Sequence, residues 1–276
     1  MRGWWREFAG LVLPVSCGGC GRPRTALCPL CAAELTGSGP GPVRPAPEPE
    51  GLPDVHAAAP YEGGVRALIL AHKERGALAL AGPLGGALAG AVEAAERASG
   101  GPGPGPLLLV PVPSSRRSVR ARGHDPTRRI ALAAAGRLRR TGRAARVLAV
   151  LRQRRRVADQ SELDARGRLA NLAGALEVSA GGVRLLDEAA RAGGRVVLVD
   201  DLMTTGASLA EAARALAAAR PGGPRPFIPG LRDSPKGEGA EALFEQPAAA
   251  VVASSPSSFE INRNSRGSCI VAGGER

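Results

Sequence analysis

The stretch from Arg195 to Ser208 constrains the fold of this chain most, because an apolar run, two acids and a hydroxyl-rich loop follow one another in it. Val196 to Val199 predict a buried parallel strand. Asp200 and Asp201 stand where we expect that strand to end. The Ala- and Leu-rich run from Leu209 to Ala219 predicts a helix. This order predicts an α/β fold, in which ligands bind at the carboxyl ends of parallel strands.

The loop between the acids and the helix has the chemistry of an anion site. Thr204, Thr205 and Ser208 offer hydroxyl donors, and Gly206 allows a ligand to approach the backbone closely. The N–H groups at the start of a helix bind phosphate well. The adjacent carboxylates can accept two ribose hydroxyls or bind a hydrated Mg²⁺. The pattern therefore predicts a site for a ribose that carries a 5′-phosphate.

Two other interpretations fit parts of this stretch. An acid pair after a strand is also found in P-loop ATPases, but these need a G-x-x-x-x-G-K-[ST] loop. The two lysines, Lys73 and Lys236, do not lie in such a loop. The second alternative is a buried strand, an acidic turn and a capped helix without a ligand.

Four cysteines near the start form the pattern C-x2-C-x7-C-x2-C, at positions 17, 20, 28 and 31. Each C-x2-C turn places two thiolates on one side of a metal, and four of them make a closed tetrahedral Zn²⁺ site. Such a site is structural, because it leaves no coordination position open. Two disulfides and an iron–sulfur cluster are the alternatives. Cys269 is alone in a polar tail, and we expect an unpaired thiol without a role there.

The stretch from 195 to 208 closely resembles the PRPP-binding motif of type I phosphoribosyltransferases, which has two acids and then T-T-G-x-[ST]. With the cysteine pattern, the whole chain resembles members of the ComF family. The resemblance implies a type I phosphoribosyltransferase-like parallel sheet flanked by helices, with a small N-terminal zinc-binding module. It implies catalytic, ribose-binding roles for Asp200 and Asp201. It also implies a 5′-phosphate loop made of Thr204, Thr205, Gly206, Ala207 and Ser208.

A second strand-then-loop unit begins at Leu107 and matches the family pattern V-P-V-P-x-x-R. The resemblance implies that Ser114, Ser115 and Arg116 receive pyrophosphate there. Arginine suits this role, because its guanidinium matches phosphate oxygens in a bidentate way.

The family usually continues with R-G-F-N-Q, whereas this chain reads Arg122-Gly123-His124-Asp125-Pro126. The last three residues depart from the pattern. We expect His124 to lie in a surface loop, with a general acid/base as the alternative. We expect Lys73 to be a surface lysine, with a phosphate contact as the alternative.

The chain divides into a zinc module (1–35), a Pro/Gly-rich linker (36–53), a phosphoribosyltransferase-like domain (54–264) and a tail (265–276). Gly, Pro and charged residues predict an insertion loop at 220–247. A segment resembling Q-x-x-L…R-x-x-N, with Gln160, Arg166, Arg168 and Asn171, predicts a mobile loop over the site. We expect further strands at 55–60, 175–178 and 248–253, and helices at 64–72, 76–98 and 126–140.

The net charge of +12 favours anionic ligands, and residues 114–156 hold 15 arginines and one acid. Aromatic residues for stacking on single-stranded nucleic acid are absent from that segment. The sequence contains no run of 18 apolar residues, so we expect no transmembrane helix. The start of the chain lacks an Ala-x-Ala cleavage site, so we expect a cytoplasmic protein with reduced thiols.

The function that the resemblance implies is Mg²⁺-dependent transfer of 5-phosphoribosyl from PRPP to an unidentified acceptor, with release of pyrophosphate. One alternative is a non-catalytic component of competence, DNA uptake or DNA repair that binds DNA or a DNA-uptake helicase. A regulator that senses PRPP is another. The sequence leaves oligomerisation open.

Overall fold

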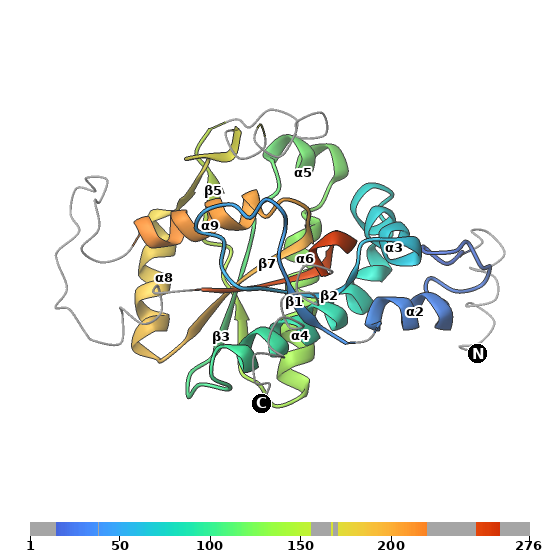
Figure 1. The fold of residues 1–276 in the computed structure, drawn as a ribbon, viewed down its shortest axis with the longest axis horizontal. Coiled ribbons are helices and arrows are strands. Elements are labelled where there is room, and N and C mark those ends of the chain that lie inside the picture. Colours follow the sequence, from blue (N-terminus) through green and yellow to red (C-terminus); the bar gives the residue numbers. More distant parts are fainter. Residues whose placement is uncertain (1–14, 38, 156–166, 168–170, 220–246, 260–276) are drawn as a thin grey trace, which may run out of the picture.

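The centre of the computed structural model is a six-stranded sheet in the order β1-β2-β8-β7-β3-β4 (Figure 1). The model describes residues 15–37, 39–155, 167, 171–219 and 247–259. β1 runs antiparallel to β2, and the other neighbouring pairs are parallel. The strands are β1 (Gly41–Val43), β2 (Val55–Pro60), β3 (Leu107–Pro111), β4 (Ala145–Val147), β7 (Arg195–Met203) and β8 (Ala248–Ser254). β5 (Leu151–Gln153) and β6 (Leu176–Val178) form a separate antiparallel pair.

Helices cover both faces of this sheet (Figure 1). One face packs against α3 (Gly63–Glu74), α4 (Ala81–Ala98) and α6 (Pro126–Arg140). The other face packs against α8 (Ala180–Arg191) and α9 (Ala207–Ala218). Other helical elements in the described part of the chain include α2 (Pro29–Thr36), the 3-10 helix η1 (Leu78–Leu80) and α5 (Arg116–Arg122). This is the layered architecture that strands alternating with helices produce.

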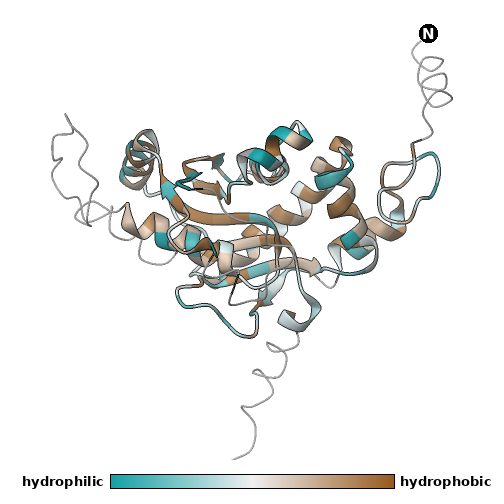
Figure 2. Cartoon of the chain, turned by 90° about the horizontal axis from the view of Figure 1, so that it is seen from above, coloured by the Kyte–Doolittle hydropathy of each residue, from teal (hydrophilic) through white to brown (hydrophobic). Residues whose placement is uncertain are grey.

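The side chains of β7 show why the strand is apolar throughout its first half. Val197 and Val199 belong to the core on the α3, α4 and α6 face, and Val196 and Leu198 belong to the core on the other face. A strand buried on both faces needs apolar residues at every position. Figure 2 shows the hydrophobic strands between the two helical layers.

Small residues allow α4 and α6 to pack closely where the two helices cross. A Cβ atom added to Gly85 of α4 would lie 2.5 Å from the Cβ of Ala133 in α6. The two backbones therefore approach closely, and the core is densely packed here without large side chains. The segment Leu78–Ala98 is long and apolar enough to cross a membrane, but 61% of its most apolar window is buried inside the fold. It is the core helix of this sheet layer.

The structure confirms the predicted strands at the centre of the sheet and the helix from 126 to 140, and it changes three details. β7 continues to Met203, so the two acids lie inside the strand and not after it. Part of the expected linker forms β1, whose Val43 is buried. The arginine-rich segment after Ser115 forms α5. The expected insertion at 220–247 lies outside the described residues except for Pro247, and so does Cys269.

Candidate functional site

The two acids lie near the carboxyl end of β7, between β3 and β8. The Asp201 side chain is buried at 3% exposure, and Asp200 is half-buried. Their position in a central parallel strand is the one at which ligands bind in open α/β sheets. The structure thus brings the predicted acid pair to the edge of the sheet where a site is expected.

Lys73, near the end of α3, makes an ion pair with Asp201. Its Nζ lies 3.1 Å from Oδ1 and 2.9 Å from Oδ2 of Asp201. Burial lowers the pKa of Lys73, but the charges of Asp201 and Asp200 raise it more, so the pKa stands above the usual lysine value. The expectation of an ordinary surface lysine is therefore wrong, because the direction of α3 aims this residue at the acids.

Asp200 accepts two hydrogen bonds through Oδ1. Thr127 of α6 donates from Oγ1 at 3.3 Å, and the backbone N–H of Asp201 donates at 2.8 Å. Burial and the charge of Asp201 raise the pKa of Asp200 to about 8, although Lys73 acts in the opposite direction. The surroundings of the ligand-free site therefore favour the protonated form of Asp200 next to the ion pair of Lys73 and Asp201.

The loop after β7 turns into α9 at Gly206, whose φ of 76° lies in the left-handed region that favours glycine. Among the described residues, no side chain caps the N-terminus of α9, whereas Ser179 caps α8 by accepting from the N–H of Gly182. The first N–H groups of α9 are thus available to an anion. Thr204 is exposed, and Thr205 and Ser208 are half-buried beside these groups.

The predicted pyrophosphate loop follows β3, the neighbour of β7 in the sheet. Ser115 caps α5, and its Oγ accepts from the N–H of Ser118 at 3.0 Å. The Ser115 hydroxyl also donates to the Ser118 hydroxyl at 2.7 Å. Ser114 is half-buried. The helix α5 begins at Arg116. Pyrophosphate binding by Ser114, Ser115 and Arg116 stays a prediction.

The turn between α5 and α6 packs against the end of α3. The Arg122 guanidinium donates to Glu74 from Nε at 2.8 Å and from Nη2 at 2.7 Å. His124 donates from Nε2 to the carbonyl oxygen of His72 at 3.2 Å. His124 lies in the loop between the two helices, as expected, but its side chain is half-buried and packs against α3. Its ring fills the space between α3 and the start of α6, where the family pattern has phenylalanine.

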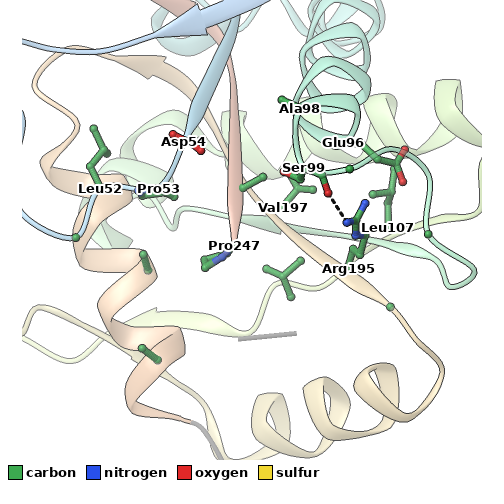
Figure 3. A pocket seen from close by; sticks show the side chains of 18 of the residues that line it. Leu52, Pro53, Asp54, Glu96, Ala98, Ser99, Leu107, Arg195, Val197 and Pro247 are labelled. Carbon is green, nitrogen blue, oxygen red and sulfur yellow. Dashed lines mark hydrogen bonds between the residues drawn. The ribbon is translucent and has the colours of Figure 1, made fainter. Parts of the chain in front are cut away.

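A cavity of about 1480 Å³ lies on the α8 and α9 side of the sheet, near the amino ends of β3, β7 and β8 (Figure 3). Leu107, Arg195 and Pro247 are among its lining residues. The Arg195 guanidinium is engaged there, since it donates to the Ser99 carbonyl at 2.6 Å and to the Gly101 carbonyl. The acid pair does not line the cavity. We assign it no ligand, because its wall includes Pro247, which directly follows residues 220–246, and these lie outside the described part of the chain.

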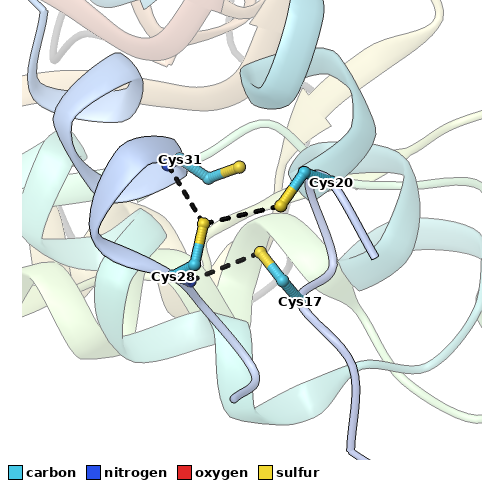
Figure 4. A group of neighbouring side chains, drawn as sticks. All are labelled: Cys17, Cys20, Cys28 and Cys31. Atoms are coloured by element: carbon cyan, nitrogen blue, oxygen red, sulfur yellow. Dashed lines mark hydrogen bonds between the residues drawn. The ribbon is translucent and has the colours of Figure 1, made fainter. Parts of the chain in front are cut away.

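The four N-terminal cysteines gather at one point (Figure 4). Their sulfur atoms all lie within 4.8 Å of one another, and the Sγ atoms of Cys20 and Cys28 are 3.5 Å apart. They are free thiols, so the alternative of two disulfides is not what this structure shows. A tetrahedron with Zn–S bonds of about 2.3 Å has sulfur–sulfur edges of about 3.8 Å. The four cysteines therefore fit a structural zinc ion, which leaves no position for catalysis.

Backbone groups around the cysteines favour thiolates. The N–H of Cys28 donates to the Sγ of Cys17 at 3.3 Å, and the N–H of Cys31 donates to the Sγ of Cys28 at 3.5 Å. Burial raises the pKa of Cys17, but such N–H groups outweigh it and bring the pKa to about 6. Burial raises the pKa of Cys31. A bound cation would stabilise all four as thiolates.

Sequence reasoning missed the contacts that surround the acids. Thr127 carries no motif signal, and the sequence indicates a phosphate contact for Lys73 only as an alternative. Of the predicted mobile loop, Gln160, Arg166 and Arg168 lie outside the described residues. Asn171 lies at the edge of that segment, where its carbonyl accepts from Arg155 at 2.9 Å.

A comparison with protein-family models matches residues 130–222 to the phosphoribosyl transferase domain. The match includes β7, its acid pair and the loop to α9. With the mostly parallel sheet flanked by helices, it identifies a type I phosphoribosyltransferase-like fold with a small N-terminal cysteine module. The match begins after the predicted pyrophosphate loop. A search of curated proteins finds no match to the chain.

Proposed function

We propose that this chain binds PRPP with Mg²⁺ and transfers its 5-phosphoribosyl group to an acceptor, with release of pyrophosphate. One observation carries the proposal. The acid pair at the carboxyl end of β7 is followed at once by an uncapped helix N-terminus with Gly206 in the left-handed conformation. This places acceptors for ribose hydroxyls next to donors for a phosphate, as a ribose 5-phosphate requires.

Each part of PRPP has a matching group in this arrangement. Asp200 and Asp201 accept the ribose hydroxyls, and residues 204–208 hold the 5′-phosphate. The loop with Ser114 and Ser115, on the neighbouring strand β3, receives the pyrophosphate. Lys73 adds a positive charge beside the acids. The oxygen ligands near this edge of the sheet suit Mg²⁺, which neutralises pyrophosphate charge when it is bound.

The groups of the chain act mainly by position and charge. Displacement at C1 of the ribose passes through a transition state with positive charge on the sugar, which the carboxylates stabilise. Lys73 orients Asp201 through both carboxylate oxygens. Asp200 must give up its proton to become the second anionic acceptor, because its pKa is about 8 in the ligand-free protein. We therefore expect PRPP binding to release protons at neutral pH.

Calorimetry of PRPP binding to the zinc-loaded chain, with and without Mg²⁺, tests the proposal. We expect Mg²⁺-dependent binding that is lost when Asp200 and Asp201 are both replaced by Asn. Asp54→Asn is the matched control, because its side chain is 76% exposed and lies outside the acid pair. A folded double variant with undiminished affinity would refute the assignment. If the parent protein binds PRPP, a screen of nucleobases for pyrophosphate release would identify the acceptor.

A ComF-type role in competence or DNA repair is the second candidate, and exposed arginines favour it. Arginines 117 and 120 of α5 and 128, 129, 137 and 140 of α6 are all exposed. Such a surface suits the phosphates of DNA. DNA binding through several phosphates must weaken steeply with salt. Measured binding that does not respond to salt, or no binding at low salt, would exclude this role for the surface.

A further inference from the structure

The turn from Arg122 to Thr127 contacts both halves of the acid site, although its sequence departs from the family pattern. Arg122 binds Glu74 through two hydrogen bonds, at 2.8 and 2.7 Å. His124 donates to the carbonyl of His72 at 3.2 Å. Glu74 and His72 are the two chain neighbours of Lys73. The turn therefore contacts α3 on both sides of the lysine that pairs with Asp201, through the side chain of Glu74 and through the backbone carbonyl of His72.

Packing supports these polar contacts. His72 is fully buried, and its ring meets the ring of His124 edge to face, with centroids 5.6 Å apart. In the neutral tautomer that donates from Nε2, the Nδ1 atom of His124 lies 3.2 Å from the carbonyl of Arg122 without a proton to donate, so the bond to His72 and the ring contact hold the ring. A ring fixed in this way transmits the position of the turn to α3.

The same turn also reaches Asp200. Asp125 caps α6 by accepting from the N–H of Arg128 at 3.0 Å, and Pro126 stands in the first turn of that helix. This start fixes Thr127, which is 3% exposed and donates to Asp200 at 3.3 Å. One turn thus sets the surroundings of both acids, because Lys73 and Thr127 both depend on its placement.

We propose that Arg122 and His124 are positioning residues that hold the Lys73 ammonium on Asp201 and so prepare the site for PRPP. The use of the site for PRPP rests on the proposed function, whereas the placement of Lys73 is a property of the ligand-free protein. A purely structural role for the two residues predicts lower stability with an unchanged Lys73 ammonium in the folded protein.

The Lys73 ammonium can be observed directly, because the chain has two lysines. In a Lys236→Arg background, ¹⁵N-lysine labelling leaves one side-chain ammonium signal. His124→Phe keeps an aromatic ring and removes the donor to His72, and Arg122→Gln removes the charged pair with Glu74. Arg120→Gln is the matched control, because Arg120 is an exposed residue of the same helix.

We expect the ammonium protons of Lys73 to exchange faster with water in both variants and to be unchanged in Arg120→Gln. Loss of one such contact should weaken PRPP binding by about three- to tenfold. His124→Gln, which restores an amide donor, should recover part of both effects. Unchanged exchange in folded His124→Phe and Arg122→Gln would overturn the positioning role. Failure of the parent protein to bind PRPP would refute the proposed function, while the ammonium signal still decides the positioning role.

Discussion

Replacing Asp200 by Asn should stabilise the ligand-free protein, although it removes a group that we assign to the ligand. The pKa of Asp200 is about 8 in the folded protein, against an ordinary value of 3.8. Between these values the folded state keeps a proton that the unfolded state has lost. The stability contributed by this proton is therefore complete below pH 3.8 and is lost as pH rises towards 8.

The size of the effect follows from the width of that pH range. Each pH unit within it removes about 1.4 kcal/mol, so the cost at pH 7 is at most about 4 kcal/mol. The coupling to Asp201 and structure in the unfolded chain reduce this, and we expect about 1 to 3 kcal/mol. Asn has the shape of the protonated acid, and its Oδ1 can still accept from Thr127 and from the N–H of Asp201. The substitution therefore removes the ionisation and keeps the hydrogen bonds.

Urea unfolding of zinc-loaded protein, from about pH 5.5 to about pH 8.5, measures this difference. The free energies of unfolding of Asp200→Asn and the parent should diverge as pH rises. Asp54→Asn should follow the parent at every pH, because the Asp54 side chain is 76% exposed and its ion pair contributes little. A difference that stays constant with pH, or an Asp200→Asn protein that is less stable throughout, would refute the reasoning.

Three further predictions test the core, the phosphate loop and the cysteine module. Gly85→Ala should destabilise the protein by about 1 to 3 kcal/mol, because the new Cβ would lie 2.8 Å from the backbone nitrogen of Ala134. Gly86→Ala, which meets nothing within 4 Å in the same helix, should stabilise it by about 0.5 to 1 kcal/mol; equal effects in urea unfolding would contradict the close α4–α6 crossing. Gly206→Ala should weaken PRPP binding at least about tenfold in calorimetry, because alanine is strained at this positive φ; unchanged affinity would remove the loop from the site. Cys17→Ser should hold less than about half an equivalent of zinc where the parent holds about one, and equal metal contents would exclude Cys17 as a ligand.

The central part of the fold was predictable from the sequence because its signals are local. The apolar run before Asp200, the glycine after the two threonines and the periodic helix from 126 to 140 each act over a few residues. α5 was not predicted, because its sequence is rich in arginine and has no apolar face. β1 was not predicted, because three residues of a Pro- and Gly-rich segment form a strand only when they pair with β2.

The surroundings of the acids could not be predicted for a different reason. Lys73 is 128 residues away from Asp201 in the sequence, and Thr127 is 73 residues away from Asp200. These contacts depend on the directions in which α3 and α6 cross the sheet, which no local pattern specifies. Motif reasoning could therefore name the acids and not the groups that set their charge.

The cysteine module belongs to the same physical unit as the acid site, because both depend on α3. At the start of α3, Glu34 of the module accepts from the N–H of Gly64 at 2.8 Å and caps a helix that its own residues leave uncapped. At its end, Arg75 donates to the Gly18 carbonyl at 3.4 Å.

The cysteines also share a core with the middle of this helix, since Cys28 and Cys31 are buried in the cluster that contains Leu68. A helix of 12 residues is about 18 Å long, so the module braces α3 from its first turn to the turn that carries Lys73. A structural metal at the cysteines would thus stabilise more than a peripheral knuckle, because it would fix the helix from which the lysine reaches Asp201.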